Sequence, residues 1–230
     1  METRMEVKRG FKTSIPVLLG YIPIAISFGL LSKGAGLSLQ DTFAMSFFVY
    51  AGASQFMAVD LISQGLAYGS IILATFLLNL RHFMMSASLS INLEGLDKKY
   101  LPIAAFGITD ESFAIASFQK EEATLPFILT LFFSAHTVWW MGSILGYLVG
   151  EILPESLQSS LSIGLYAMFV GLLFSQIKKD KMIIRLSLLS MLVYFTIYKI
   201  GIIGSGWDII LAILISSGIG AYLFERGGGR

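Results

Sequence analysis

The sequence predicts an all-α fold: a polytopic bundle of seven or eight transmembrane helices that forms one domain over residues 1–230. Apolar residues make up 55% of the chain, charged residues make up 13%, and the mean hydropathy is +0.76. A soluble domain needs more charge than this to cover its surface. The apolar residues also gather in stretches of roughly 20, which is the length that crosses a bilayer as a helix.

Eight apolar windows account for most of the chain, and short polar joints separate them. The windows cover about residues 13–32, 41–63, 66–91, 100–118, 125–150, 157–177, 182–203 and 207–224. The joint at Gln64-Gly65 is so short that, in the seven-span alternative, one of its two neighbouring segments is re-entrant. None of the joints is long enough to divide the bundle into separate domains.

The first window follows a basic N-terminus and is longer than the apolar core of a signal peptide. It also lacks a small-residue cleavage pattern, so we expect it to remain as the first transmembrane helix. With eight crossings and the N-terminus in the cytoplasm, most of the sixteen Lys and Arg lie on the cytoplasmic side. The prediction is therefore a multi-pass protein of the cytoplasmic (inner) membrane with a cytoplasmic N-terminus.

An internal duplication is one interpretation of a short recurring motif. Ser38-Leu39-Gln40 precedes the second window, and Ser156-Leu157-Gln158 precedes the sixth. The repeat halves would be 1–120 and 121–226. Many secondary transporters consist of two such halves, with broken helices and the substrate site at their interface.

Several functional classes have no support in the sequence. There is no cysteine, and the two histidines, His82 and His136, give no metal-ligand pattern, so we expect no metal and no cofactor. The scattered cations give no footprint for nucleic acid. Neither G-x-S-x-G nor H-E-x-x-H occurs, so we expect no enzyme. The lipid bilayer is the partner that composition predicts.

Small residues interrupt the second window at Tyr50-Ala51-Gly52-Ala53-Ser54-Gln55-Phe56. Glycine and serine weaken a helix, so we expect a break that exposes backbone groups, which transporters use to hold substrates. Close packing of two helices against these small residues is the other interpretation. The candidate substrate-binding residues in this segment are Gly52, Ser54, Gln55 and Phe56.

The third window carries a fixed cation, Arg81, inside a hydrophobic run. A charge at membrane depth is costly unless it faces protein, water or a partner, which makes Arg81 a candidate site residue. The alternative is a side chain that extends to the membrane edge. A polar stripe at helical spacing follows the same helix and comprises Thr75, Asn79, His82, Ser86 and Ser90.

Arg81 lies about 100° around the helix from His82. We therefore expect that these two side chains cannot both point at one small ligand unless the helix unwinds locally. Asn79, Arg81 and His82 are the candidate substrate-binding residues of this window.

The fourth window supplies a partner for the cation in the adjacent carboxylates Asp110 and Glu111. Long apolar flanks place both acids in mid-window, where both cannot cheaply stay ionised. We expect one to pair with Arg81 and the other to be a candidate proton carrier. The alternative is an interfacial loop in which both acids are solvated.

The fifth window contains Gly142, Gly146 and Gly150 at a spacing of four. This spacing puts the three glycines on one helix face. It predicts close packing against another helix, of this chain or of a partner.

Taken together, these segments resemble the AzlC-type branched-chain amino acid permeases, the large subunits of the LIV-E amino acid exporters. The resemblance covers nearly the whole chain. It rests on Gly20, Pro23 and the stretch 24–29, on the 50–56 segment, on Thr75-Phe76, Asn79-Leu80-Arg81-His82 and the 86–89 segment, and on Thr109-Asp110-Glu111 with Phe113-Ala114.

The resemblance implies proton-coupled export of leucine, isoleucine, valine and analogues by a secondary transporter. It also implies a complex with a small AzlD-type membrane subunit. The residues suit a zwitterion, because a cation can meet its carboxylate and an acid can meet its ammonium. A non-transporting membrane scaffold or channel-forming subunit remains the alternative function, since buried ion pairs also serve packing.

Overall fold

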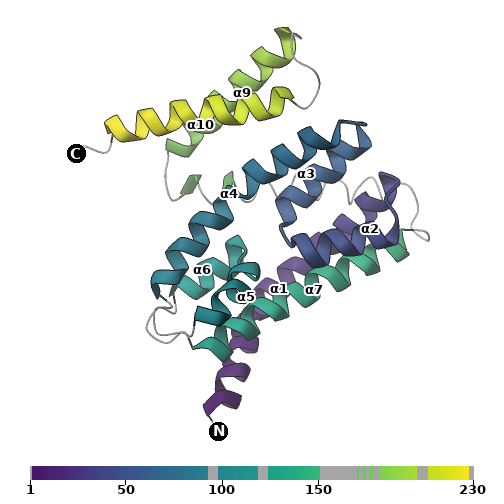
Figure 1. Cartoon of the computed structure of the whole chain (residues 1–230), viewed down its shortest axis with the longest axis vertical. Helices are drawn as coiled ribbons and strands as arrows, with labels where there is room; N and C mark the ends of the chain where they lie inside the picture. The colour runs from purple at the N-terminus through teal and green to yellow at the C-terminus, as the bar shows by residue number, and fades with distance from the viewer. Residues whose placement is uncertain are drawn as a thin grey trace.

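The computed structural model describes residues 2–92, 98–118, 124–150, 170, 173–174, 177–178, 182–200 and 207–227, and the regular elements in these ranges are helices (Figure 1). Four of them contain a stretch that is long and apolar enough to cross a membrane: α1 (Glu2–Gly34), α4 (Tyr68–Asn92), α7 (Leu125–Val149) and α9 (Met182–Ile200). A shorter apolar stretch lies in α10 (Trp207–Gly227). The predicted helical membrane bundle is confirmed.

The second and fourth windows are not single helices. The second contains α2 (Leu39–Ala44), the π-helix η1 (Met45–Val49) and α3 (Gly52–Ser63), so the break predicted there is confirmed. The fourth contains the short helix η2 (Lys98–Tyr100), α5 (Leu101–Phe106) and α6 (Asp110–Phe118). The fourth window is therefore not one continuous helix, because three residues between α5 and α6 leave the helix. Most of the sixth window, with Ser156-Leu157-Gln158, lies outside the described residues.

The long helices α1 and α7 lie side by side along the base of the molecule (Figure 1). A Cβ atom added to Gly29 would lie 2.0 Å from the Ser143 carbonyl oxygen, and one added to Gly146 would lie 2.1 Å from the Ile26 carbonyl oxygen. The two backbones therefore touch, as small residues allow in membrane helices. We call this close contact between α1 and α7 the seam. The glycines of the fifth window pack against a helix of this chain.

Three helices meet in an aromatic core next to this seam. Phe28 of α1 lies edge-on to Phe56 of α3 at 5.4 Å between ring centroids, and it stacks with Trp139 of α7 at 6.3 Å. All three side chains are buried. The core fixes α3 against the α1–α7 pair, while α9 and α10 pack on each other at the opposite end of the view (Figure 1).

Two glycines of α1 give a matched test of the seam. We expect Gly29→Ala to lower the stability of the protein by about 1–3 kcal/mol, because the added methyl group overlaps backbone that cannot move away. Gly20→Ala serves as the control, since no atom of the described residues lies within 4 Å of a Cβ atom added there. The measurement is the apparent unfolding temperature in detergent. Equal temperatures for the two variants would contradict the close seam.

Candidate functional site

The first helix break begins where η1 widens the helix before Tyr50. Tyr50 adopts the left-handed conformation (φ 45°, ψ 46°), Ala51 is neither helical nor extended (φ −134°, ψ 77°), and α3 begins at Gly52. A Cβ atom on Gly52 would lie 2.9 Å from the tip of the Trp139 indole. Gly52 therefore lets the start of α3 lie directly on Trp139, and its backbone N–H belongs to an N-terminal turn without intrahelical partners.

The side chains of Gln55 and His136 form hydrogen bonds with backbone groups at the break. Gln55 Oε1 accepts hydrogen bonds from the Ala51 N–H at 3.0 Å and from the Trp139 indole N–H at 3.1 Å. His136 Nε2 lies 3.0 Å from the Phe47 carbonyl oxygen. Gln55 is 1% exposed, so it holds the break in shape from inside the protein.

The second break, at 107–109, has its own local causes. A Cβ atom on Gly107 would lie 2.5 Å from Phe132 Cβ, so the chain passes α7 where only glycine fits. Thr109 and Ser112 then exchange hydrogen bonds: the Thr109 N–H donates to Ser112 Oγ at 2.8 Å, and the Ser112 N–H donates to Thr109 Oγ1 at 3.3 Å. This cap starts α6 with two acids in its first turn, where the helix dipole stabilises negative charge.

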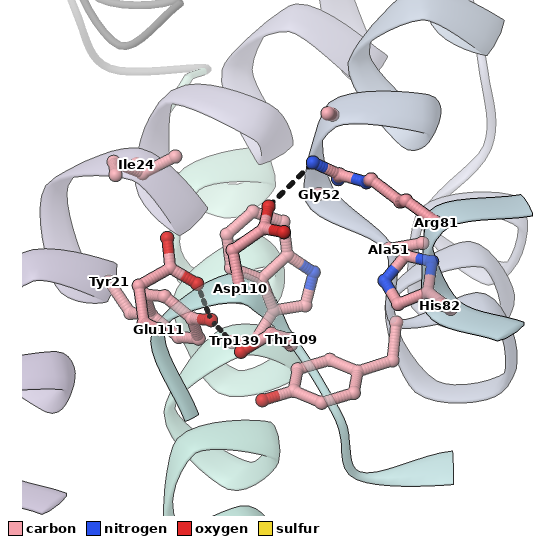
Figure 2. A pocket seen from close by; sticks show the side chains of 12 residues that line it. Tyr21, Ile24, Ala51, Gly52, Arg81, His82, Thr109, Asp110, Glu111 and Trp139 are labelled. Atoms are coloured by element: carbon pink, nitrogen blue, oxygen red, sulfur yellow. Dashed lines mark hydrogen bonds and ion pairs between the residues drawn. The ribbon is translucent and has the colours of Figure 1, made fainter. Parts of the chain in front are cut away.

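Arg81 of α4 reaches the first of these acids. Its Nη1 lies 2.5 Å from Asp110 Oδ2, and the two side chains are 34% and 35% exposed (Figure 2). The expected ion pair is confirmed, with Asp110 as the partner. The cation of the continuous helix α4 thus meets its opposite charge at the start of the half-helix α6.

The second acid is held by α1. The Tyr21 hydroxyl lies 2.7 Å from Glu111 Oε2 and 2.7 Å from Thr109 Oγ1 (Figure 2). Tyr21 is 5% exposed, and its ring packs edge-on against Trp139 at 5.4 Å. Asp110 and Glu111 are adjacent in sequence, but they have different partners on different helices.

These groups surround a cavity of about 40 Å³. Its lining residues are Tyr21, Ile24, Tyr50, Ala51, Gly52, Ala53, Arg81, His82, Thr109, Asp110, Glu111 and Trp139 (Figure 2). One water needs roughly 10–15 Å³ of such space. The cavity therefore has room for a few waters, and a larger ligand requires its walls to move apart.

The structure brings together five of the residues predicted from the sequence: Gly52, Arg81, His82, Asp110 and Glu111 all line this cavity. Arg81 and His82 both line the cavity, and the helix α4 runs through both positions without unwinding. The expectation that they cannot both point at one small ligand stays a prediction.

The other predicted residues lie elsewhere. Ser54 and Phe56 are buried in the first turns of α3, where the Ser54 hydroxyl donates to the Ala51 carbonyl at 2.9 Å and Phe56 packs in the aromatic core. Gln55 supports the break. Asn79 lines a neighbouring cavity, one helical turn before His82.

Sequence reasoning missed three residues at this site. Tyr21 and Trp139 come from α1 and α7, whose windows look uniformly apolar, although a tyrosine in mid-span needs a hydrogen-bond partner. Thr109 could have been found, because Thr109-Asp110-Glu111-Ser112 has a capping residue followed by acids, the pattern that opens a helix.

The fold and the site define an integral membrane protein whose polar centre is built from discontinuous helices, an arrangement found in transporters. The chain belongs to the AzlC family: the family model described as "AzlC protein" matches residues 16–153. This matched region contains the part of α1 from residue 16 onward, all of α2 to α7, and every residue of the cavity.

Individual relatives agree with this membership. An uncharacterized membrane protein of Archaeoglobus fulgidus is 36% identical over 173 residues, which cover 74% of this chain and 76% of the relative. The inner membrane protein YgaZ of Escherichia coli is 28% identical over 83% of this chain and 82% of its own length. The branched-chain amino acid transport protein AzlC of Bacillus subtilis is 25% identical over 76% and 69%. No solved structure matches significantly.

Gln55 provides a test of the first break. We expect Gln55→Leu to destabilise the protein, because the buried N–H groups of Ala51 and Trp139 would lose their acceptor. Each unsatisfied donor should lower the free energy of unfolding by about 1–3 kcal/mol. Gln64→Leu, at an exposed glutamine that ends the same helix, should leave stability nearly unchanged. Thermal unfolding in detergent measures both. A Gln55→Leu protein as stable as the Gln64→Leu control would contradict this role.

Proposed function

We propose that this protein is a secondary transporter that exports branched-chain amino acids across the cytoplasmic membrane, coupled to protons. The observation that carries the proposal is the Arg81–Asp110 ion pair between the continuous helix α4 and the half-helix α6, inside a chain whose family includes a branched-chain amino acid transport protein. A zwitterion needs one cationic and one anionic contact, and this pair supplies both.

Substrate binding exchanges one ion pair for two. The carboxylate of the amino acid meets the Arg81 guanidinium and the N-terminal turn of α3 at Gly52 and Ala53, both of which line the cavity. Asp110, released from Arg81, then meets the ammonium. Every charge keeps a partner during the exchange, which limits the cost of holding charges away from water.

Glu111 is the candidate proton carrier in this scheme. Its carboxylate accepts a hydrogen bond from Tyr21 and does not contact Arg81 in the state described. A proton arriving at Glu111 would weaken its hydrogen bond with the Tyr21 hydroxyl of α1, which also contacts Thr109 at the second break. Protonation is thereby coupled to the helix segments that surround the substrate.

The remaining parts of the proposal come from the resemblance and from charge placement. We assign a cytoplasmic N-terminus, in agreement with the distribution of Lys and Arg, and a small AzlD-type membrane subunit as partner. Reconstitution into vesicles with and without such a subunit separates a transporter from a scaffold. Counterflow of labelled leucine in either preparation supports transport, and its absence in both favours a non-transporting scaffold or channel-forming subunit.

The two acids have separable roles, which mutation can test. We expect the Asp110→Asn, Glu111→Gln double variant to lose proton-driven leucine transport, while Glu111→Gln alone retains leucine counterflow and loses its dependence on a pH gradient. Tyr21→Phe should weaken that dependence. Asp60→Asn, at an exposed aspartate near the end of α3, is the control. Wild-type transport by the double variant would refute the coupling role of the acids.

Two substitutions test the role of Arg81 in binding: one removes its charge, and the other keeps the charge and changes the shape of the side chain. We expect Arg81→Gln to abolish leucine binding and Arg81→Lys to weaken it by about 10–100-fold, because hydrogen bonds to charged groups contribute about 1.5–3 kcal/mol and lysine lacks the planar fork. Arg185→Gln, at an exposed arginine of α9, should bind as wild type. Stabilisation of the detergent-purified protein by leucine measures binding. Unchanged binding by Arg81→Gln would overturn the assignment.

A further inference from the structure

A second cavity lies directly against the charged one. The two share Tyr50, Ala51 and His82 as walls, and the second has a volume of about 220 Å³ against about 40 Å³ for the first. It lies between the first helix break, α4 and the half-helix α5. Its lining residues are Val49, Tyr50, Ala51, Asn79, His82, Ala105, Phe106 and Ile108.

The two cavities differ in chemistry. Arg81, Asp110 and Glu111 all line the first cavity, whereas among the described residues that line the second there is no acid, lysine or arginine. Six of the eight residues that line the second cavity have aliphatic or aromatic side chains, and the other two are Asn79 and His82. The acids and the arginine therefore lie on one side of the shared wall, where the charged end of an amino acid could meet them.

The volumes also fit this division. An apolar cavity of about 150 Å³ accommodates benzene, so 220 Å³ is ample for a branched aliphatic side chain. The first cavity has room for only a few waters, and a whole amino acid requires the additional space beside it.

We propose that the second cavity is the side-chain subsite of the transporter, and that Ala105 and Phe106 set the largest side chain it accepts. This inference rests on the proposed function. The α-carbon of the substrate lies at the wall shared by Ala51 and His82, with its charged groups toward Arg81 and Asp110. The Oδ1 atom of Asn79, which lines the second cavity, is buried and has no hydrogen-bond partner among the described residues, so it offers an acceptor beside the shared wall.

Phe106 and Ala105 lie where their own size can limit the substrate side chain that the second cavity accepts. The Phe106 ring lies 6.2 Å from the Tyr50 ring and 5.5 Å from the His136 ring, measured between centroids. His136 in turn contacts the Phe47 carbonyl of the first break, so the position of Phe106 is tied to that break. Ala105 precedes it on the same half-helix, and its small side chain leaves space that a larger residue would fill.

Two opposite substitutions test the subsite. Labelled leucine counterflow by the full chain in vesicles is inhibited with unlabelled alanine, valine, leucine and phenylalanine. Ala105→Phe should raise the inhibitory concentration of leucine relative to alanine by about 10-fold or more, the discrimination that a side chain of the wrong size produces in an apolar pocket. Phe106→Ala should make phenylalanine an effective inhibitor. Ile103→Ala is the control, because Ile103 is on the same half-helix, is 44% exposed and lines neither cavity.

A second measurement covers variants that no longer transport. Stabilisation of each detergent-purified variant by the same four amino acids reports binding alone. A change of size preference in either assay, with Ile103→Ala unchanged, supports the subsite. The wild-type order in both Ala105→Phe and Phe106→Ala overturns it and leaves the proposed function standing. A wild-type protein that neither transports nor binds any of the four refutes the proposed function and the subsite together.

Discussion

The polar centre of this protein depends on the ion pair between Arg81 and Asp110. A lone guanidinium within an apolar helix is costly, and Asp110 removes that cost only because the fourth window breaks just before it. The break puts Asp110 and Glu111 at the start of a half-helix, where the dipole favours their charge. The same break separates α5, whose Ala105 and Phe106 then line the neighbouring apolar cavity.

The seam between α1 and α7 positions two aromatic side chains beside this polar centre. Glycines let the two backbones touch, which brings Tyr21 of one helix and Trp139 of the other into ring contact beside the cavity. Tyr21 extends to Glu111, and Trp139 extends to Gln55. Tyr21 thus ties α6 to the α1–α7 pair, and Trp139 ties α3 to it, each through a hydrogen bond from an aromatic side chain.

The proposed amino acid substrate needs separate places for its charged groups and its side chain, and the first break lies between the two cavities that would supply them. Tyr50 and Ala51, which leave the helix at that break, form a wall of both cavities. The family match covers all of these residues. The same local distortion exposes helix N–H groups to one side and apolar side chains to the other.

The sequence alone determined the helical membrane class, the first break and the pairing of Arg81 with an acid, because hydropathy, small-residue clusters and the cost of a buried charge are local properties. Only the tertiary structure decided which acid pairs, that Gln55 supports the break, and that Tyr21 and Trp139 belong to the site. These outcomes depend on how the apolar helices α1 and α7 are rotated, because that rotation points Tyr21 and Trp139 toward the breaks. Helix packing sets this rotation, and periodicity within one window does not contain that information.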